Sequence, residues 1–255
     1  MDAARHTFRL CGVTDGRYTP NNKEIADLQA LRRGVFAKRA LVSGQVITTE
    51  DYYLAFPCQE GQLLANDLSK YTTVSVGSQM IEKDSPLFVR NLLIHDNRNK
   101  VETIVNRIMD LISKSNVVIP VGSPCEISHH YGIDHFDEKG VAMIECINRE
   151  YCKKVLIMMP GQAHPSHYHK QKEETFLVLY GSLDIVCNGR ERHISRGESV
   201  VVERGIDHSF YSKEGCVFEE ISTTHMGNDS FYKDADKFVN PRKTRVYLTE
   251  DFLKY

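Results

Sequence analysis

The sequence predicts a mainly β protein, with a small β-rich unit first, a helix next and a β barrel or sandwich last. From about residue 117 onward, short strand-like segments are separated by turns about every eight to twelve residues, which is typical of sandwiches and barrels. Asn188-Gly189 lies between two such segments and is a strong hairpin signal. Residues 100–114 instead carry apolar side chains at helical spacing, which predicts an amphipathic packing helix.

Composition narrows the class of protein. The 255 residues are 41% hydrophobic and 26% charged, with a formal net charge of -2, so no basic face for nucleic acid is expected. No apolar run approaches the ~20 residues of a membrane helix, and Met1–Arg9 lack the apolar run of a secretory signal. The seven cysteines are odd in number and include no CxxC pair, which argues against a disulfide framework. We therefore expect a cytoplasmic protein whose partner is neither nucleic acid nor membrane.

The N-terminal segment combines a short helix with strands. Asn22 is a candidate cap for the helix. Residues 35–37 and 46–49 have strand patterns and flank a predicted turn at Ser43-Gly44. Residues 52–56 are predicted to form a further strand, so the segment is a small unit with few apolar residues for a core.

The C-terminal segment is predicted to consist of strands and turns. Gly181 is expected to break the chain between two of these strands, and Glu214-Gly215 marks another turn. The predicted strands are 155–159, 175–180, 183–187, 190–194, 199–203, 208–211 and 216–223.

Three histidines and one glutamate in this segment form a candidate metal site. His167 and His169 are two residues apart and share one side of a strand, Glu174 begins the next strand, and His208 comes from a later one. Imidazole and carboxylate ligands suit Mn, Zn, Fe, Co or Ni better than Ca or Mg, and Mn is the first expectation. Four protein ligands would leave two positions of an octahedron for substrate oxygens. The alternative is that the histidines bind no metal.

The spacing of these residues follows two short patterns. The first is G-x5-H-x-H-x4-E-x6-G and the second is G-x5-P-x-G-x2-H-x3-N, with Glu203 at the proline position and Ser212 at the asparagine position. These patterns resemble the two motifs of the cupins, which implies a double-stranded β-helix barrel that holds a metal. The matching residues are Gly161, His167, His169, Glu174, Gly181, Gly197, Gly205 and His208.

Residues 167–174 and 218–223 are similar to the D-lyxose ketol-isomerase group of cupins, and this resemblance covers roughly residues 120–235. It implies that Lys172 and Glu220 accompany the metal in catalysis, with Glu220 as base and Lys172 beside the sugar oxygens. Strand alternation places Glu219 and Glu220 on opposite faces, and parity alone does not say which one faces inward. The motif favours Glu220, with Glu219 as the alternative. Lys172 could instead belong to a solvated turn.

The remaining histidines give weaker signals. His129, His130 and His135 could line the mouth of the pocket or belong to a loop, and His225 could cover the barrel rim. Four others are expected at the surface, namely His6, His95, His164 and His193.

Residues 31–47 resemble an SAF (antifreeze-like) domain, a unit that ends the sialic acid synthases, and the resemblance covers about residues 20–85. In those synthases the domain contributes an arginine from an Arg-Pro-Gly turn, whereas this chain has Phe56-Pro57-Cys58 there, without the arginine. The expected domains are an SAF domain over 1–85, a helical linker over 86–116 and a metal-binding cupin over 117–255. This order is similar to the C-terminal part of a nonulosonic acid synthase.

The function expected from these resemblances is that of a metal-dependent sugar aldose–ketose isomerase in sialic acid or surface-glycan synthesis. The alternative is a non-catalytic sugar-binding or regulatory module of such a synthase. An oxygen-dependent cupin with Fe is a third hypothesis, compatible with the ligand set alone. Cupins and SAF domains commonly pair, so a homodimer that takes a small-molecule sugar is expected by analogy.

Overall fold

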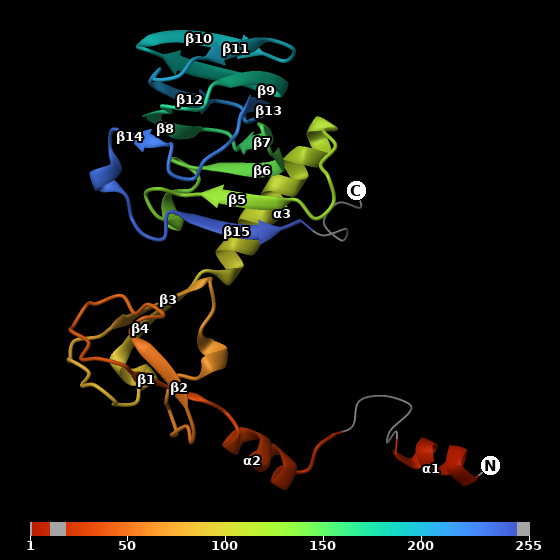
Figure 1. The fold of residues 1–255 in the computed structure, drawn as a ribbon, viewed down its shortest axis with the longest axis vertical. Helices are drawn as coiled ribbons and strands as arrows, with labels where there is room; N and C mark the ends of the chain where they lie inside the picture. The colour runs from red at the N-terminus through yellow and green to blue at the C-terminus, as the bar shows by residue number, and fades with distance from the viewer. Residues whose placement is uncertain (1, 11–18, 249–255) are drawn as a thin grey trace. The chain divides into compact units, whose positions relative to one another are not determined.

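The computed structural model describes residues 2–10 and 19–248, which excludes Cys11, and divides into two compact units, Met1–Asn97 and Arg98–Tyr255 (Figure 1). Strands dominate the second unit, which confirms the mainly β fold class, and the first unit contains four short strands beside its helices. The assignment of the first unit as an SAF domain stays a prediction.

The first unit contains two small antiparallel strand pairs, β1 with β2 and β3 with β4. Their side chains and the loops between them enclose an apolar core that includes Val35, Leu41, Leu63 and Leu87. The elements of this unit are α1 (Asp2–Leu10), α2 (Asn22–Ala30), β1 (Gly34–Ala37), β2 (Tyr52–Ala55), η1 (Ala65–Asp67), β3 (Thr72–Val76), η2 (Val89–Asn91) and β4 (Leu92–Asp96).

Two local predictions for this unit are wrong. The cap of α2 is Asn21 rather than Asn22, because Asn21 accepts a hydrogen bond from the Glu24 amide and the Glu24 carboxylate returns one to the Asn21 amide. The predicted turn at Ser43-Gly44 is present, but residues 46–49 do not form the predicted strand, and β1 pairs with β2 instead. Within the predicted strand 46–49, Val46 makes an isolated bridge to Ser75.

The second unit is an eleven-stranded sheet that follows the helix α3. The predicted helix 100–114 lies within α3, which buries its apolar face with Val101, Ile104 and Ile108. The elements are α3 (Arg98–Ser115), β5 (Pro124–Ser128), η3 (Ile133–His135), β6 (Val141–Asn148), β7 (Tyr151–Met158), β8 (Gln162–Tyr168), β9 (Glu174–Cys187), β10 (Arg190–Ser195), β11 (Ser199–Val202), β12 (His208–Ser212), β13 (Cys216–Thr223), β14 (Phe231–Tyr232), η4 (Ala235–Lys237) and β15 (Lys243–Tyr247).

The long strand β9 makes the sheet curl. Its first residues pair with β11 on one edge and β13 on the other, whereas its last residues pair with β10 and β12. The change of partners occurs about Gly181, whose φ is +74°, so the chain bends there without the predicted break. Apolar side chains from β9 and from its partner strands fill the interior of the curled sheet. They include Phe176 and Ile185 of β9, Phe210 of β12 and Phe218 of β13.

Six of the seven cysteines lie among the described residues, and all six are free thiols. Within the described part of the chain, no helix is long and apolar enough to cross a bilayer.

Candidate metal centre

Three strands bring the predicted ligands together inside the curled sheet. His167 lies near the end of β8, His169 follows that strand directly, Glu174 begins β9 and His208 begins β12. His208 is the register partner of His167, because β12 pairs with β8. The structure therefore juxtaposes residues that are up to 41 positions apart in the sequence.

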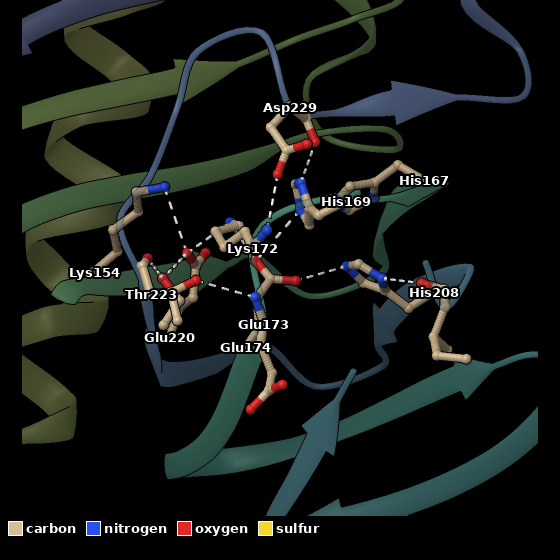
Figure 2. A network of polar contacts seen from close by, with 12 residues as sticks. Lys154, His167, His169, Lys172, Glu173, Glu174, His208, Glu220, Thr223 and Asp229 are labelled. Atoms are coloured by element: carbon tan, nitrogen blue, oxygen red, sulfur yellow. Dashed lines mark hydrogen bonds and ion pairs between the residues drawn. The ribbon is translucent and has the colours of Figure 1, made fainter. Parts of the chain in front are cut away.

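The three imidazoles point at a common place (Figure 2). One ring nitrogen of each of His167, His169 and His208 lies within 4.8 Å of the corresponding nitrogens of the other two. All three side chains are buried. Such a group can contribute three nitrogen ligands to one ion.

Backbone carbonyls fix which nitrogen of each ring faces that place. The Nδ1 atom of His167 is 3.1 Å from the Pro165 carbonyl oxygen, and that of His208 is 3.0 Å from the carbonyl oxygen of Ile206. His169 Nδ1 is 2.6 Å from the Asp229 carbonyl oxygen. A carbonyl can only accept, so Nδ1 carries the proton and Nε2 of each neutral ring keeps its lone pair for a metal.

Glu174 supplies the carboxylate that the sequence predicted beside these rings. Its Oε2 is 3.1 Å from His208 Nε2, and its Oε1 is 3.4 Å from His169 Nε2. Among the buried polar atoms without a hydrogen-bond partner are His169 Nε2, His208 Nε2 and Glu174 Oε2. These buried acceptors face one another, an arrangement that a cation between them would stabilise, so the residues fit a divalent metal.

The electrostatics of the cluster favour the forms that bind metal. Burial lowers the pKa of His167 well below its usual value and also lowers the pKa of His169, so both rings are neutral at pH 7. Burial alone would raise the pKa of Glu174, but the positive charge of the neighbouring Lys172 ammonium helps to hold it well below its usual value. Neutral imidazoles and an ionised carboxylate are the forms that act as ligands.

Lys172 and Glu220 form a buried ion pair next to the ligands (Figure 2). Lys172 Nζ is 2.9 Å from Glu220 Oε1 and also contacts Glu174 Oε1. A second buried lysine, Lys154, lies 3.5 Å from the same Glu220 oxygen. Lys172 is therefore not in a solvated turn, and it links Glu174, the predicted carboxylate ligand, to Glu220, the predicted base.

The two charges of this pair stabilise each other against burial. Burial would raise the pKa of Glu220, but the ammonium groups of Lys154 and Lys172 lower it overall. Burial would lower the pKa of Lys172, but the carboxylates of Glu220 and Glu174 raise it above its usual value. The pair is accordingly a carboxylate and an ammonium at neutral pH.

Glu219 points the other way. Its Oε1 pairs with Lys153 Nζ at 2.6 Å, and it is not among the residues that line the cavity, whereas Glu220 is. Strand alternation in β13 thus places Glu220 inside and Glu219 outside.

Asp229 holds the segment between His169 and Glu174, a contact that the sequence did not reveal. Its carboxylate accepts hydrogen bonds from the amides of Lys170, Gln171 and Lys172 at 2.9–3.2 Å. Its own carbonyl oxygen accepts from His169, as described above. One residue therefore fixes both the orientation of a ligand and the backbone that carries Lys172.

A cavity of about 600 Å³ opens onto the cluster, within the range of small-molecule sites. His164 forms part of its wall, buried, with its ring stacked on Phe210 at 4.8 Å, so the expectation that His164 lies at the surface is wrong. Tyr232 stacks on His167, with ring centroids 5.0 Å apart, and its hydroxyl lies 3.1 Å from His130 Nε2.

The other predicted histidines lie in different places. His130 and His225 line the cavity, and burial lowers the pKa of each to about 4. His129 is instead 2.9 Å from the Thr244 hydroxyl, and His135 is exposed outside the cavity. The cluster of three histidines in the sequence therefore contributes one residue, His130, to the pocket.

Residues 154–218 match the cupin domain family. This stretch runs from β7 into β13 and contains all four predicted metal ligands together with Lys172. The chain is also 25% identical, over 184 residues, to a D-lyxose/D-mannose isomerase of Thermosediminibacter oceani, which covers 60% of this chain and 98% of that protein.

Solved structures give partial similarities. The L-ribose isomerase of Geodermatophilus obscurus is 15% identical, covers 55% of this chain and 95% of its own, and has a TM-score of 0.47. A putative spore coat polysaccharide biosynthesis protein E from Chromobacterium violaceum is 35% identical over 36% of this chain and 27% of its own, with a TM-score of 0.29.

Proposed function

We infer that this chain is a metal-dependent isomerase that interconverts an aldose and a ketose. The observation that carries the proposal is the buried Lys172–Glu220 ion pair beside three imidazoles and Glu174. Such an isomerisation moves a proton between C1 and C2, which needs a base beside the carbon and an electrophile beside the oxygens. Similarity to a D-lyxose/D-mannose isomerase supports the same class of reaction.

The side chains divide the chemistry among them. A divalent ion, Mn first and Zn, Fe, Co or Ni as alternatives, would act as Lewis acid on the oxygens at C1 and C2. The Glu220 carboxylate takes the proton from C2 of the aldose and returns it to C1. The Lys172 ammonium hydrogen-bonds the substrate oxygens while the hydroxyl proton moves from O2 to O1. One proton moves from C2 to C1 and one from O2 to O1, so the aldose and the ketose are isomers and no oxidant or reductant is required.

The first test is ketose formation from a panel of pentoses, hexoses and acylated hexosamines with Mn. We expect turnover that a chelator abolishes and Mn restores. Glu220→Gln should lower kcat by about a hundredfold or more, the usual range for removal of a general base. Glu219→Gln is the matched variant on the other face of β13, and it should keep near-normal activity because that carboxylate faces Lys153. No ketose from any sugar, or equal losses in both variants, would contradict the proposal.

A non-catalytic sugar-binding or regulatory module is the second candidate, and one observation favours it. Glu220 Oε1 already contacts Lys172 at 2.9 Å and Lys154 at 3.5 Å, which weakens it as a base. Calorimetry would support this candidate if sugars bind without conversion and Glu220→Gln leaves their affinity unchanged.

The wider setting is also part of the proposal. The SAF-like pattern over residues 31–47 is the reason to place the activity in sialic acid or surface-glycan synthesis. We also propose that the protein acts in the cytoplasm and forms a homodimer. The homodimer is proposed by analogy with cupins and SAF domains.

A further inference from the structure

The cavity wall contains a guanidinium without an acidic partner. Arg242 lies directly before β15 and lines the cavity. Among the residues that the structure describes, its side chain lies against the ring of Phe238, with the guanidinium carbon 6.0 Å from the ring centroid, and it forms no ion pair. A cation that lines a pocket and is not neutralised within it can bind an anion there.

A row of contacting aromatic rings connects Arg242 with the predicted metal ligands, which line the same cavity. From the predicted ligand His167 the row continues to Tyr232 and then to His130. The ring of His130 stacks on Phe238 at 4.5 Å, and Phe238 faces Arg242. The positive charge of Arg242 adds to burial in lowering the pKa of His130. The guanidinium thus contacts the end of this row of rings that is opposite to His167.

The charged side chains that line the cavity also favour the binding of an anion. Glu126 is shared by two cations, since its Oε2 lies 3.1 Å from Lys243 Nζ and 3.2 Å from an Arg245 nitrogen. A divalent ion at the histidines would add two further positive charges to a lining in which cationic side chains already outnumber anionic ones by five to four. The cationic residues are Lys154, Lys172, Arg242, Lys243 and Arg245, and the anionic ones are Glu126, Glu145, Glu174 and Glu220.

We propose that the substrate is an anionic sugar whose phosphate or carboxylate binds Arg242, while its carbonyl end faces the metal ligands. This inference rests on the proposed function, because it assigns the two ends of one sugar to the two ends of the cavity. The planar guanidinium matches either anion with two parallel hydrogen bonds. A neutral sugar would leave Arg242 without a partner in the site.

The test measures binding without turnover. D-glucitol, D-glucitol 6-phosphate and L-gulonate share a six-carbon polyol chain that ends in a hydroxyl, a phosphate or a carboxylate, and none can isomerise as an aldose. Calorimetry on the Mn-loaded full chain should show that one or both anionic polyols bind at least about tenfold more tightly than D-glucitol, the gain expected for charge-assisted hydrogen bonds. The arm that binds more tightly identifies phosphate or carboxylate as the recognised group.

Variants of Arg242 separate its role from direct binding of the anion to the metal. Arg242→Gln should remove most of the preference, Arg242→Lys should keep part of it, and the exposed Arg190→Gln on β10 should leave it intact. Equal affinity for all three polyols, or a preference that survives Arg242→Gln, overturns the inference. Preferential binding of an anionic polyol that depends on Arg242 supports the inference, even if no sugar is converted. The absence of conversion would count against the proposed isomerase activity alone.

Discussion

Residue types and local spacing were enough to predict which side chains converge in the cluster, because His167, His169 and Glu174 lie within eight residues of one another and His208 stands in a second motif. The orientation of Glu219 and Glu220 needed the structure, since alternation in a strand fixes opposite faces without saying which is inside. His164 was missed because its burial depends on Phe210 and Tyr232, which are distant in sequence. Its position in a strand just before two ligands is the signal that could have found it.

A buried aspartate in the first unit gives a prediction about pH. Asp51 accepts hydrogen bonds from the amide and hydroxyl of Thr48, both at 2.8 Å, and from Arg39 Nε at 2.7 Å. Burial alone would raise its pKa, but the hydrogen bonds from Thr48 and the contact with Arg39 lower it overall. A lowered pKa in the folded state means that this stabilisation is present above the unfolded pKa and is lost as the pH falls through the folded value.

The test compares Asp51→Asn with Asp27→Asn, a change of an exposed aspartate in α2. At pH 7, Asp51→Asn should lower the free energy of unfolding of the strands β1 and β2 by about 1–3 kcal/mol, because the change removes the charge and puts an NH2 donor in place of one carboxylate oxygen that accepts hydrogen bonds. Hydrogen exchange of those strands would measure the loss, and the difference from wild type should shrink below about pH 4. A difference that grows on acidification would mean that the sign of the pKa shift is wrong.

At the scale of elements, most strands of the second unit were predicted, because turn residues such as Asn188-Gly189 mark their ends. The errors arose where tertiary pairing overrides local pattern. Residues 46–49 have a strand pattern, yet β2 is the partner of β1. Similarly, β9 continues through Gly181, because its two halves exchange partners there without leaving the sheet.

The bend in β9 predicts an unequal cost of two similar substitutions. Gly181 and Gly189 have φ values of +74° and +77°, so a side chain at either costs about 1–2 kcal/mol. A Cβ at Gly181 would in addition overlap the Gly215 carbonyl oxygen, whereas one at Gly189 has open space. Chemical denaturation should therefore show a loss of about 3 kcal/mol or more for Gly181→Ala and about 1 kcal/mol for Gly189→Ala. Equal losses would show that the close approach to Gly215 does not stabilise the bend.

At the scale of the whole molecule, the chain contains two compact units with separate apolar cores, and all four predicted ligands belong to the second. Sequence patterns located the β-rich segments and the helix, because those signals are periodic and local. The contacts of Asp229 and Tyr232 with the site could not be predicted, because the segment after β13 has no recognisable motif and acquires its role through long-range hydrogen bonds and stacking.

Whether His167, His169, Glu174 and His208 together hold one divalent ion can be measured by metal analysis of the purified protein and a calorimetric Mn titration. Wild type should bind one ion per chain, as should His193→Ala, in which the lost imidazole is exposed and paired with Asp184. His169→Ala and His208→Ala should each lower the affinity at least about a hundredfold, since each removes a nitrogen ligand. Unchanged stoichiometric binding in both ligand variants, or no binding by wild type, would mean that these four side chains do not form a metal site.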